Sequence, residues 1–193
     1  MAPPDARRLT SLHDQSLRLG RVVEDLAELA AAESAALSLR PADLDVAALV
    51  REVVDAHAAT LRAAEVRVRR ELADGVVVRA DPDRLHQAIG NLLANAARYA
   101  RPGDLVVVRV RVDGEQVVIE VADTGPGIPP EDLPHVFDRF WRGRTGAAVA
   151  GSGIGLAVVR ELVAAHGGTV TAASGPEGGS TFTVRLPWHA GPR

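Results

Sequence analysis

The fold of this chain is decided by the stretch Asn91-Leu92-Leu93-Ala94-Asn95-Ala96-Ala97-Arg98-Tyr99. Its apolar residues recur at the three- and four-residue spacing of a helix that packs one face against a core. Asn91, Asn95 and Arg98 stand at positions i, i+4 and i+7, so they share a polar face of that helix. Upstream, Asp81-Pro82 supplies a capping residue and a first-turn proline. We therefore predict one helix from Pro82 to about Tyr99.

Two glycine-rich turns come later in the chain, Asp123-Thr124-Gly125-Pro126-Gly127-Ile128 and Gly151-Ser152-Gly153-Ile154-Gly155-Leu156. The first directly follows a predicted strand. A carboxylate there can accept a hydrogen bond from the exocyclic amine of adenine, and the glycines let backbone approach the ring. The second opens a predicted helix over residues 153–166, where backbone amides can bind phosphate. Each motif alone is weak evidence, but the three in this order predict a nucleotide pocket.

Simpler interpretations of each motif remain open when it is taken alone. The two asparagines can be surface or capping residues, and Asp123 can begin an ordinary Asp-Gly turn. A dinucleotide-binding βαβ unit is not supported, because the glycines at 151–155 follow a long loop instead of a strand. A Walker A motif is absent as well, since the sequence has no Gly-Lys-Ser/Thr.

Composition excludes several other classes of function. The 193 residues contain no cysteine, which rules out disulfides, a thiol nucleophile and a cysteine-based zinc site. A net charge of −3 gives no reason to expect nucleic-acid binding. No apolar run approaches the roughly 20 residues of a membrane span, and the start of the chain does not resemble a signal peptide. We expect a cytoplasmic chain without a membrane segment, whose parent protein could be anchored in the inner membrane.

An amphipathic helix is predicted ahead of these motifs, from Arg8 to about Leu37. Leu12, Leu19 and Leu26 recur every seven residues and form a narrow apolar seam. One helix cannot bury such a seam alone, so it packs either on the rest of the chain or on a second copy in a helical bundle. We favour dimerisation, because the linker at residues 38–42 separates this helix from the next predicted helix.

The remaining pattern predicts an α+β fold. A helix capped by Asp43 or Asp45 extends to about Leu61, and the strands are expected at residues 66–70, 76–78, 105–112, 116–122, 169–173 and 181–186. Asp113-Gly114 is a hairpin signal between two of them. The loop-rich stretch over 123–152 is long enough to suggest a functional lid. We expect a two-layer α/β sandwich, with helices on one face of a mixed, largely antiparallel sheet, preceded by the long helix.

Together these motifs resemble the catalytic, ATP-binding domain of bacterial sensor histidine kinases, within the gyrase, Hsp90, histidine-kinase and mismatch-repair ATPase superfamily. The stretch 91–99 resembles the N box, 123–128 the G1 box and 151–156 the G2 box. Phe137-Asp138-Arg139-Phe140-Trp141-Arg142 is similar to the F box, and Gly178-Gly179-Ser180-Thr181-Phe182 to the closing glycine motif. The resemblance covers about residues 43–187.

The resemblance implies a Bergerat fold that binds ATP and Mg²⁺, with Asn95 on the metal and Asp123 on adenine. It implies catalytic roles for Asn91, Arg98 and Arg142 near the phosphates. It further implies a mobile lid over residues 129–150 whose base is pinned by Phe137 and Phe140. The full set of implied nucleotide-binding residues is Asn95, Arg98, Tyr99, Asp123, Gly125, Gly127, Ile128, Phe140, Gly151, Ser152, Gly153, Ile154, Gly155, Leu156 and Thr181.

The same resemblance divides the chain. Residues 1–40 would be the second helix of a dimerisation and phosphotransfer hairpin, 41–188 the ATP-binding domain and 189–193 a tail. It also implies homodimerisation through the N-terminal helix of the parent and a response-regulator receiver domain as partner. The phosphoacceptor motif is missing: His13-Asp14 is its only imitation, and it lacks the proline of that motif. The accepting histidine is therefore expected outside this chain.

Two alternatives remain within the superfamily. A water-activating ATPase of the gyrase or Hsp90 type carries a glutamate four residues before the metal-binding asparagine. Here that position is Asn91, which cannot take up a proton. A nucleotide-sensing or dimerisation module without phosphate transfer is the other alternative, and the complete set of motifs argues against it. An anti-sigma-factor serine kinase is a further relative, but the hairpin-like first helix favours a sensor kinase.

Overall fold

The computed structural model describes residues 38–141, 143, 153–175 and 178–188. They form a five-stranded sheet of order β2-β4-β5-β7-β6 and a two-stranded sheet of β1 and β3. Strand β2 is parallel to β4, and the other neighbours in the large sheet are antiparallel. The elements are β1 (Ala42–Asp45), α2 (Val46–Ala56), α3 (Ala58–Ala63), β2 (Arg67–Leu72), β3 (Val77–Ala80), α4 (Pro82–Tyr99), β4 (Leu105–Asp113), β5 (Gln116–Asp123), the 3₁₀ turn η1 (Leu133–His135), α5 (Gly155–Ala165), β6 (Thr169–Gly175) and β7 (Gly178–Pro187).

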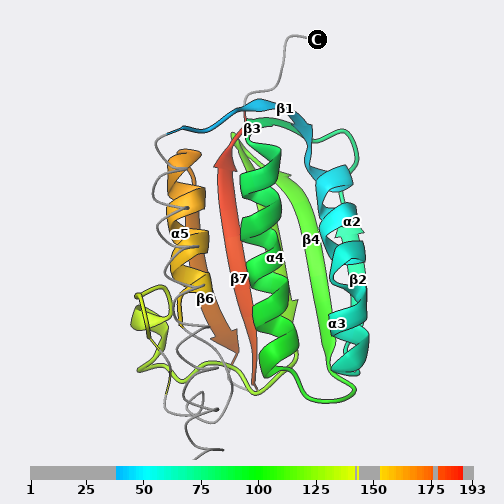
Figure 1. The fold of residues 1–193 in the computed structure, drawn as a ribbon, viewed down its shortest axis with the longest axis vertical. Helices are drawn as coiled ribbons and strands as arrows, with labels where there is room; N and C mark the ends of the chain where they lie inside the picture. The colour runs from blue at the N-terminus through cyan, green and yellow to red at the C-terminus, as the bar shows by residue number, and fades with distance from the viewer. Residues whose placement is uncertain (1–37, 142, 144–152, 176–177, 189–193) are drawn as a thin grey trace, which may run out of the picture.

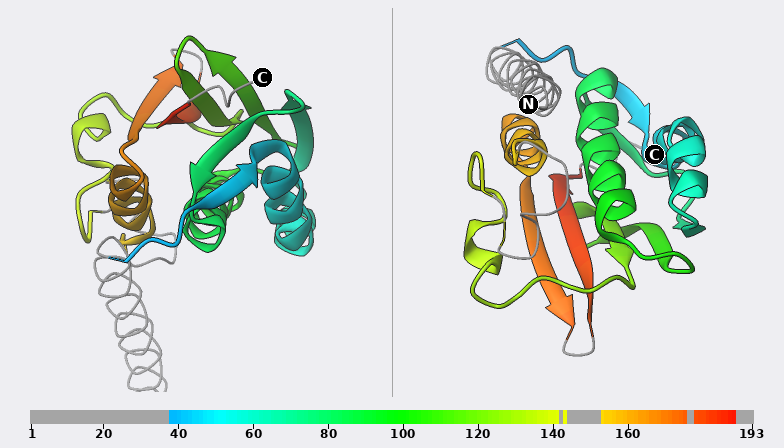
Figure 2. Two further views of the ribbon diagram at one scale, coloured as in Figure 1. Left: turned by 90° about the horizontal axis from the view of Figure 1, so that it is seen from above. Right: turned by 60° about the horizontal axis from the view of Figure 1, so that its bottom comes forward.

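Helices α2, α4 and α5 lie side by side on one face of the large sheet (Figures 1 and 2). This arrangement confirms the predicted two-layer α+β sandwich with a mixed sheet. The predicted long helix at residues 8–37 lies outside the described residues. No helix in the described ranges is long and apolar enough to span a bilayer.

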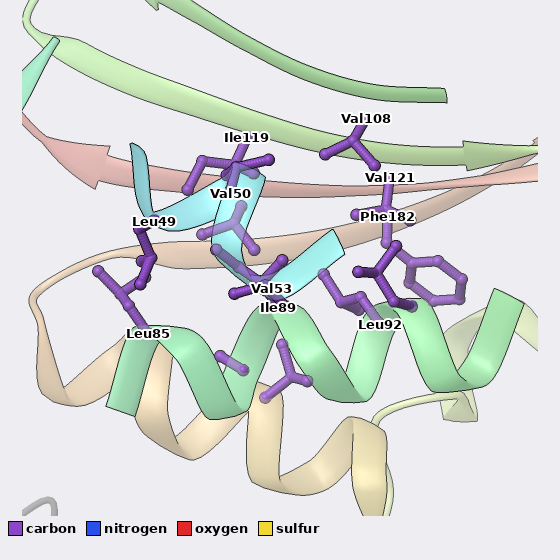
Figure 3. Packing of buried hydrophobic residues seen from close by; sticks show 14 of the residues in the cluster. Leu49, Val50, Val53, Leu85, Ile89, Leu92, Val108, Ile119, Val121 and Phe182 are labelled. Carbon is purple, nitrogen blue, oxygen red and sulfur yellow. The ribbon is translucent and has the colours of Figure 1, made fainter. Parts of the chain in front are cut away.

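The core fills the space between the helices and the covered face of the sheet. On α4, Leu85, Ile89 and Leu92 are at most 1% exposed, because their spacing keeps them on one side of the helix. Figure 3 shows them packed against inward-facing residues of the sheet and of α2, among them Ile119, Val121, Phe182, Val50 and Val53. This apolar contact holds α4 on the sheet, so the polar face carrying the two asparagines has a fixed orientation.

The opposite face of the sheet carries charged side chains, and no helix of the described residues covers it. Arg109 of β4 donates to Glu71 of β2 at 2.6 Å, and Arg69 contacts the same carboxylate at 2.8 Å. The hydrogen bond from Arg109 is the main cause that lowers the pKa of Glu71. Alternation along the strands thus gives a buried apolar face and an outer polar face.

Asp81 begins α4 and joins it to the chain segment before β1. One carboxylate oxygen accepts from the amides of Asp83 and Arg84 at 3.1 and 3.2 Å, as the predicted cap requires. The other accepts from the amide of Arg40 at 2.8 Å. Burial by itself raises the pKa of Asp81, but the backbone donors, Arg40 first, outweigh it, so the pKa is lowered.

Two local features differ from the sequence prediction. Residues 42–45, expected as linker and cap, form strand β1, which pairs with β3. The helix expected to continue to Leu61 is interrupted at His57, where α2 ends and α3 begins at Ala58. The His57 ring bends back to the carbonyl of Val53 at 2.8 Å, which favours an end to the helix at that point.

Replacing Asp81 with alanine should destabilise the fold more than replacing Asp45, the cap of α2. Asp45 accepts from Ala48 alone and is exposed, so Asp45→Ala should cost about 1 kcal/mol. Asp81 is only 5% exposed and also accepts from the Arg40 amide, so Asp81→Ala removes a further hydrogen bond and should cost about 2–3 kcal/mol. Urea unfolding at neutral pH measures both losses. Equal losses would contradict the additional stabilising role of the Asp81 carboxylate.

The contribution of Asp81 should also depend on pH. A lowered folded-state pKa means that the stabilisation is complete above the usual value of 3.8 and is lost as the pH falls through the lowered pKa. The difference in unfolding free energy between wild type and Asp81→Asn should therefore shrink on acidification. A difference that grows at low pH would oppose this assignment.

Candidate functional site

The two predicted asparagines lie on the side of α4 that faces the start of α5. Both are half-buried, whereas Arg98, farther along the same face, is exposed. The carboxamide of Asn91 donates from Nδ2 to the carbonyl oxygen of Gly155 at 3.3 Å. This hydrogen bond joins two of the three predicted motifs across 64 residues of sequence.

The third motif begins where β5 ends. One oxygen of the Asp123 carboxylate accepts from the amide of Gly125 at 2.8 Å. The other accepts a hydrogen bond from the hydroxyl of Ser180, the residue paired with Asp123 on β7. These two hydrogen bonds hold Asp123 in one orientation. Because a carboxylate offers about four acceptor positions, it can still accept a hydrogen bond from a ligand.

The turn after Asp123 is fastened to the end of the β6–β7 hairpin. The carbonyl of Gly125 accepts from the amide of Gly179 at 2.8 Å. The Ser174 hydroxyl accepts from the amide of Ile128 and donates to the carbonyl of Gly179, both at 2.9 Å. Gly127 has a φ of +77°, and a Cβ there would lie 2.6 Å from the Ser174 oxygen. Glycine is therefore required at position 127 both by its conformation and by its neighbour.

The Asp123 turn also lies against the end of α4. A Cβ placed on buried Gly125 would be 3.5 Å from the carbonyl oxygen of Tyr99. The Tyr99 side chain itself is 37% exposed. The end of α4, the end of β5, the start of α5 and the β6–β7 turn therefore meet at one end of the molecule, the lower end in Figure 1.

The base of the predicted lid is closed mainly by backbone contacts. The amide of Phe140 donates to the carbonyl of Gly153 at 3.0 Å. Phe140 has a φ of 63°, a left-handed conformation that is uncommon for a bulky residue. Its side chain is 53% exposed, whereas Phe137 packs edge-to-face on Phe182 with ring centroids 6.3 Å apart. Phe137 thus holds the base of the lid against the core through its ring, and Phe140 holds it through a main-chain hydrogen bond.

Some predicted site residues lie elsewhere or outside the described ranges. Arg142, Gly151 and Ser152 are not among the described residues. Thr181 is paired with Ala122, one position beyond the Asp123–Ser180 pair, so alternation directs its side chain to the opposite face of the sheet. Ile154 is 1% exposed and belongs to the core, and half-buried Leu156 packs against that core.

Two hydroxyl residues at this site are missing from the predicted set. Ser174 and Ser180 each contact the Asp123 turn from the β6–β7 hairpin. Their position beside the glycines of that hairpin is the only sequence signal for such a role. The register of β6 and β7 brings these serines to the Asp123 turn. That register depends on pairing between distant segments, so local residue spacing does not reveal it.

Alanine at Gly153 should disrupt the base of the lid. At a φ of +76°, the new Cβ would lie 2.6 Å from the carbonyl oxygen of Trp141 and 2.8 Å from the carbonyl carbon of Phe140. We expect a loss of about 3 kcal/mol in unfolding free energy, together with faster hydrogen exchange of the Phe140 amide. Gly75, at a φ of +71° with nothing within 4 Å of a Cβ, is the matched control and should lose about 1 kcal/mol. Equal losses for the two variants would refute the close packing at Gly153.

The chain resembles known proteins in sequence. The family model described as "Histidine kinase-, DNA gyrase B-, and HSP90-like ATPase" matches residues 80–190. The sensor-like histidine kinase SenX3 of Mycobacterium tuberculosis is 39% identical over 172 residues, which are 88% of this chain and 42% of the relative. The chain thus spans less than half the length of that relative.

Solved structures share the fold of this chain. The histidine kinase AdeS of Acinetobacter baumannii superposes with a TM-score of 0.71 at 30% sequence identity, covering 97% of this chain and 87% of that one. Full-length ShkA in complex with AMPPNP gives a TM-score of 0.76 at 28% identity, covering 97% of this chain and 39% of that one. By its motifs, its fold and these matches, the chain belongs to the family of histidine kinase-, DNA gyrase B- and HSP90-like ATPases.

Proposed function

We propose that this chain is the ATP-binding catalytic portion of a two-component sensor histidine kinase, which transfers the γ-phosphoryl group of ATP to a histidine outside the chain. The observation that carries the proposal is the meeting of the Asn91 and Asn95 face of α4, the Asp123 turn and the start of α5 at one end of the fold. The similarity to SenX3 and AdeS, both named histidine kinases, supports the kinase branch of the family.

Adenine recognition is assigned to the Asp123 turn. The carboxylate is oriented by the Gly125 amide and the Ser180 hydroxyl, so it meets the exocyclic amine of adenine as a prearranged acceptor. Gly125 and Gly127 keep backbone without side chains beside it. Tyr99, exposed at the end of α4, lines the same region.

Phosphate binding is assigned to the start of α5. Helices α2 and α4 are both capped by aspartate side chains, but among the described residues, which leave out 144–152, no side-chain hydrogen bond caps α5. A helix start without a side-chain cap leaves backbone amides and the positive end of the helix dipole for an anion. Arg98 on α4 and Arg142 in the lid supply additional positive charge for the phosphates.

Magnesium fits this site only as an ion held largely by the nucleotide. The described residues contain no group of three or more His, Cys, Asp or Glu side chains that could hold a metal. Magnesium usually keeps several waters and takes phosphate oxygens together with one or two protein ligands. The half-buried carboxamide of Asn95 is the protein ligand that we assign, and the bound ion would balance negative charge on the phosphates.

The chemistry required of this chain is positioning and charge neutralisation. In the transfer, the bond between the γ-phosphorus and the bridging oxygen breaks, a histidine nitrogen forms the new bond to phosphorus, and ADP leaves. No general base is needed on α4, and the Asn91 carboxamide is engaged as a donor to Gly155. This contact disfavours the water-activating ATPase, which needs a proton acceptor at that position.

The wider assignments rest on the relatives and on sequence. We assign residues 1–40 to a dimerisation helix, 41–188 to the ATP-binding domain and 189–193 to a tail. The parent would form a homodimer through its N-terminal helices, pass the phosphoryl group to a response-regulator receiver domain and work in the cytoplasm, whether or not it is anchored in a membrane. The chain's 42% share of SenX3 is consistent with such a longer parent.

Replacing Asp123 with asparagine should weaken ATP binding about 10- to 100-fold, because a charge-assisted hydrogen bond to adenine is lost. Asparagine retains a carbonyl oxygen for the Gly125 amide, so the turn should persist. Asp113→Asn, at an exposed hairpin carboxylate, is the matched control and should leave the affinity unchanged. Titration calorimetry with ATP and magnesium measures both, and an unaltered affinity in Asp123→Asn would exclude Asp123 from the site.

Phosphoryl transfer should require a phosphoacceptor histidine that lies outside this chain. Incubated alone with γ-labelled ATP, the chain should bind nucleotide but acquire little label. Adding a longer version of the parent that includes the preceding hairpin helix, with its own ATP site inactivated, should give an acid-labile label on that added protein. Strong acid-labile labelling of His13 in the chain alone would contradict the assignment, and steady ATP hydrolysis would favour the ATPase alternative.

A further inference from the structure

A second hydrogen bond joins α4 and α5 at the ends remote from the candidate site. His166, the residue that ends α5, accepts at Nε2 from the backbone amide of Asp81 at 3.0 Å. Its Nδ1 lies 2.7 Å from the carbonyl oxygen of Leu162. Because Nε2 accepts from an amide, it carries no proton, and Nδ1 must be the donor to Leu162. The ring therefore bridges the last turn of α5 and the residue that caps α4.

The two helices are fixed to each other at two points. The Asp81–His166 bond lies at one end, and the Asn91–Gly155 bond lies toward the other. This order makes the helices antiparallel. Asp81 and Asn91 are about 15 Å apart along α4, and Gly155 and His166 about 16 Å along α5, at 1.5 Å per residue. The two spans match, so the bonds bracket the shared length of helices that lie side by side in Figures 1 and 3.

The contact between these two points is apolar. Ala88 on α4 and Val158 and Leu162 on α5 lie between the two bonds and are buried in the same core. Apolar packing is not directional, so it opposes separation more strongly than a small axial shift. A shift of one residue, about 1.5 Å, would lengthen and misalign both hydrogen bonds and so weaken them. The hydrogen bonds therefore set the axial register of α4 on α5.

We propose that His166 is a positioning residue for nucleotide binding. It holds α4 and α5 in the register that keeps the asparagine face opposite the start of α5, although its ring lies at the far end of both helices. This inference rests on the proposed function, since it assumes that both helices bind one nucleotide. The Asp81 carboxylate also accepts from the Arg40 amide. The segment that precedes β1 is therefore bonded to the same residue that joins the two helices.

Three variants of His166 separate this role from a general loss of stability. His166→Ala removes the acceptor and should weaken binding of ATP and magnesium about three- to tenfold. His166→Gln has the length to present an oxygen to the Asp81 amide and should bind within about twofold of wild type. His166→Asn is too short to reach Asp81 and should resemble His166→Ala.

Trp188→Phe is the matched control. Its indole Nε1 donates to the carbonyl oxygen of Val77 at 3.1 Å, a bond that also links distant parts of the sequence but does not join α4 to α5. This variant should lower the thermal midpoint and leave nucleotide affinity unchanged. Thermal melting establishes that each variant is folded, and titration calorimetry then gives its affinity.

The outcomes are distinct. A wild-type chain that does not bind ATP overturns the proposed function and this inference with it. A wild-type chain that binds ATP, with all His166 variants unchanged, overturns the inference alone. If His166→Ala does not fold, the Asn and Gln variants decide: equal affinities for those two overturn the proposal, and stronger binding by the Gln variant supports it.

Discussion

The register between β5 and β7 is the constraint on which the rest of the site depends. It pairs Asp123 with Ser180 and, two residues earlier on β5, Val121 with Phe182. Phe182 is 1% exposed in the core, so the same register that buries the ring brings the serine hydroxyl to the carboxylate. A slip of one residue would turn Phe182 toward the polar face and remove the partner of Asp123. Burial of a large apolar side chain therefore fixes the orientation of a polar one.

Local periodicity explains why much of this arrangement could be predicted. Helix α4 carries its cap, its first-turn proline and its apolar stripe within one continuous segment, and the observed bounds Pro82–Tyr99 agree with these signals. The strands around Asp113-Gly114 likewise contain their own alternation and turn. The convergence of Asn91 with Gly155 was predicted from the order of motifs, and the hydrogen bond between them supports it.

The features that escaped prediction depend on contacts between distant residues. Three of the four residues of strand β1 are exposed, and the strand forms because β3 is available to pair with it. Ser174 contributes through bonds to Ile128 and Gly179, which no spacing in its own strand specifies. The left-handed conformation of Phe140 likewise accompanies a bond to Gly153 across the lid. Sequence patterns describe each element by itself, and these features arise only when elements meet.

The two ends of α5 are held in different ways, and the difference has a physical consequence. Its C-terminal end is tied to α4 through His166, while no side chain of the described residues caps its N-terminal end. A cap there would raise helix stability by about 1 kcal/mol but would occupy amides that an anion could use. Anchoring the far end compensates, since a helix fixed at one terminus and packed along its length does not need a cap to stay in place. The start of α5 can then remain open to a phosphate without loss of its position relative to Asn91.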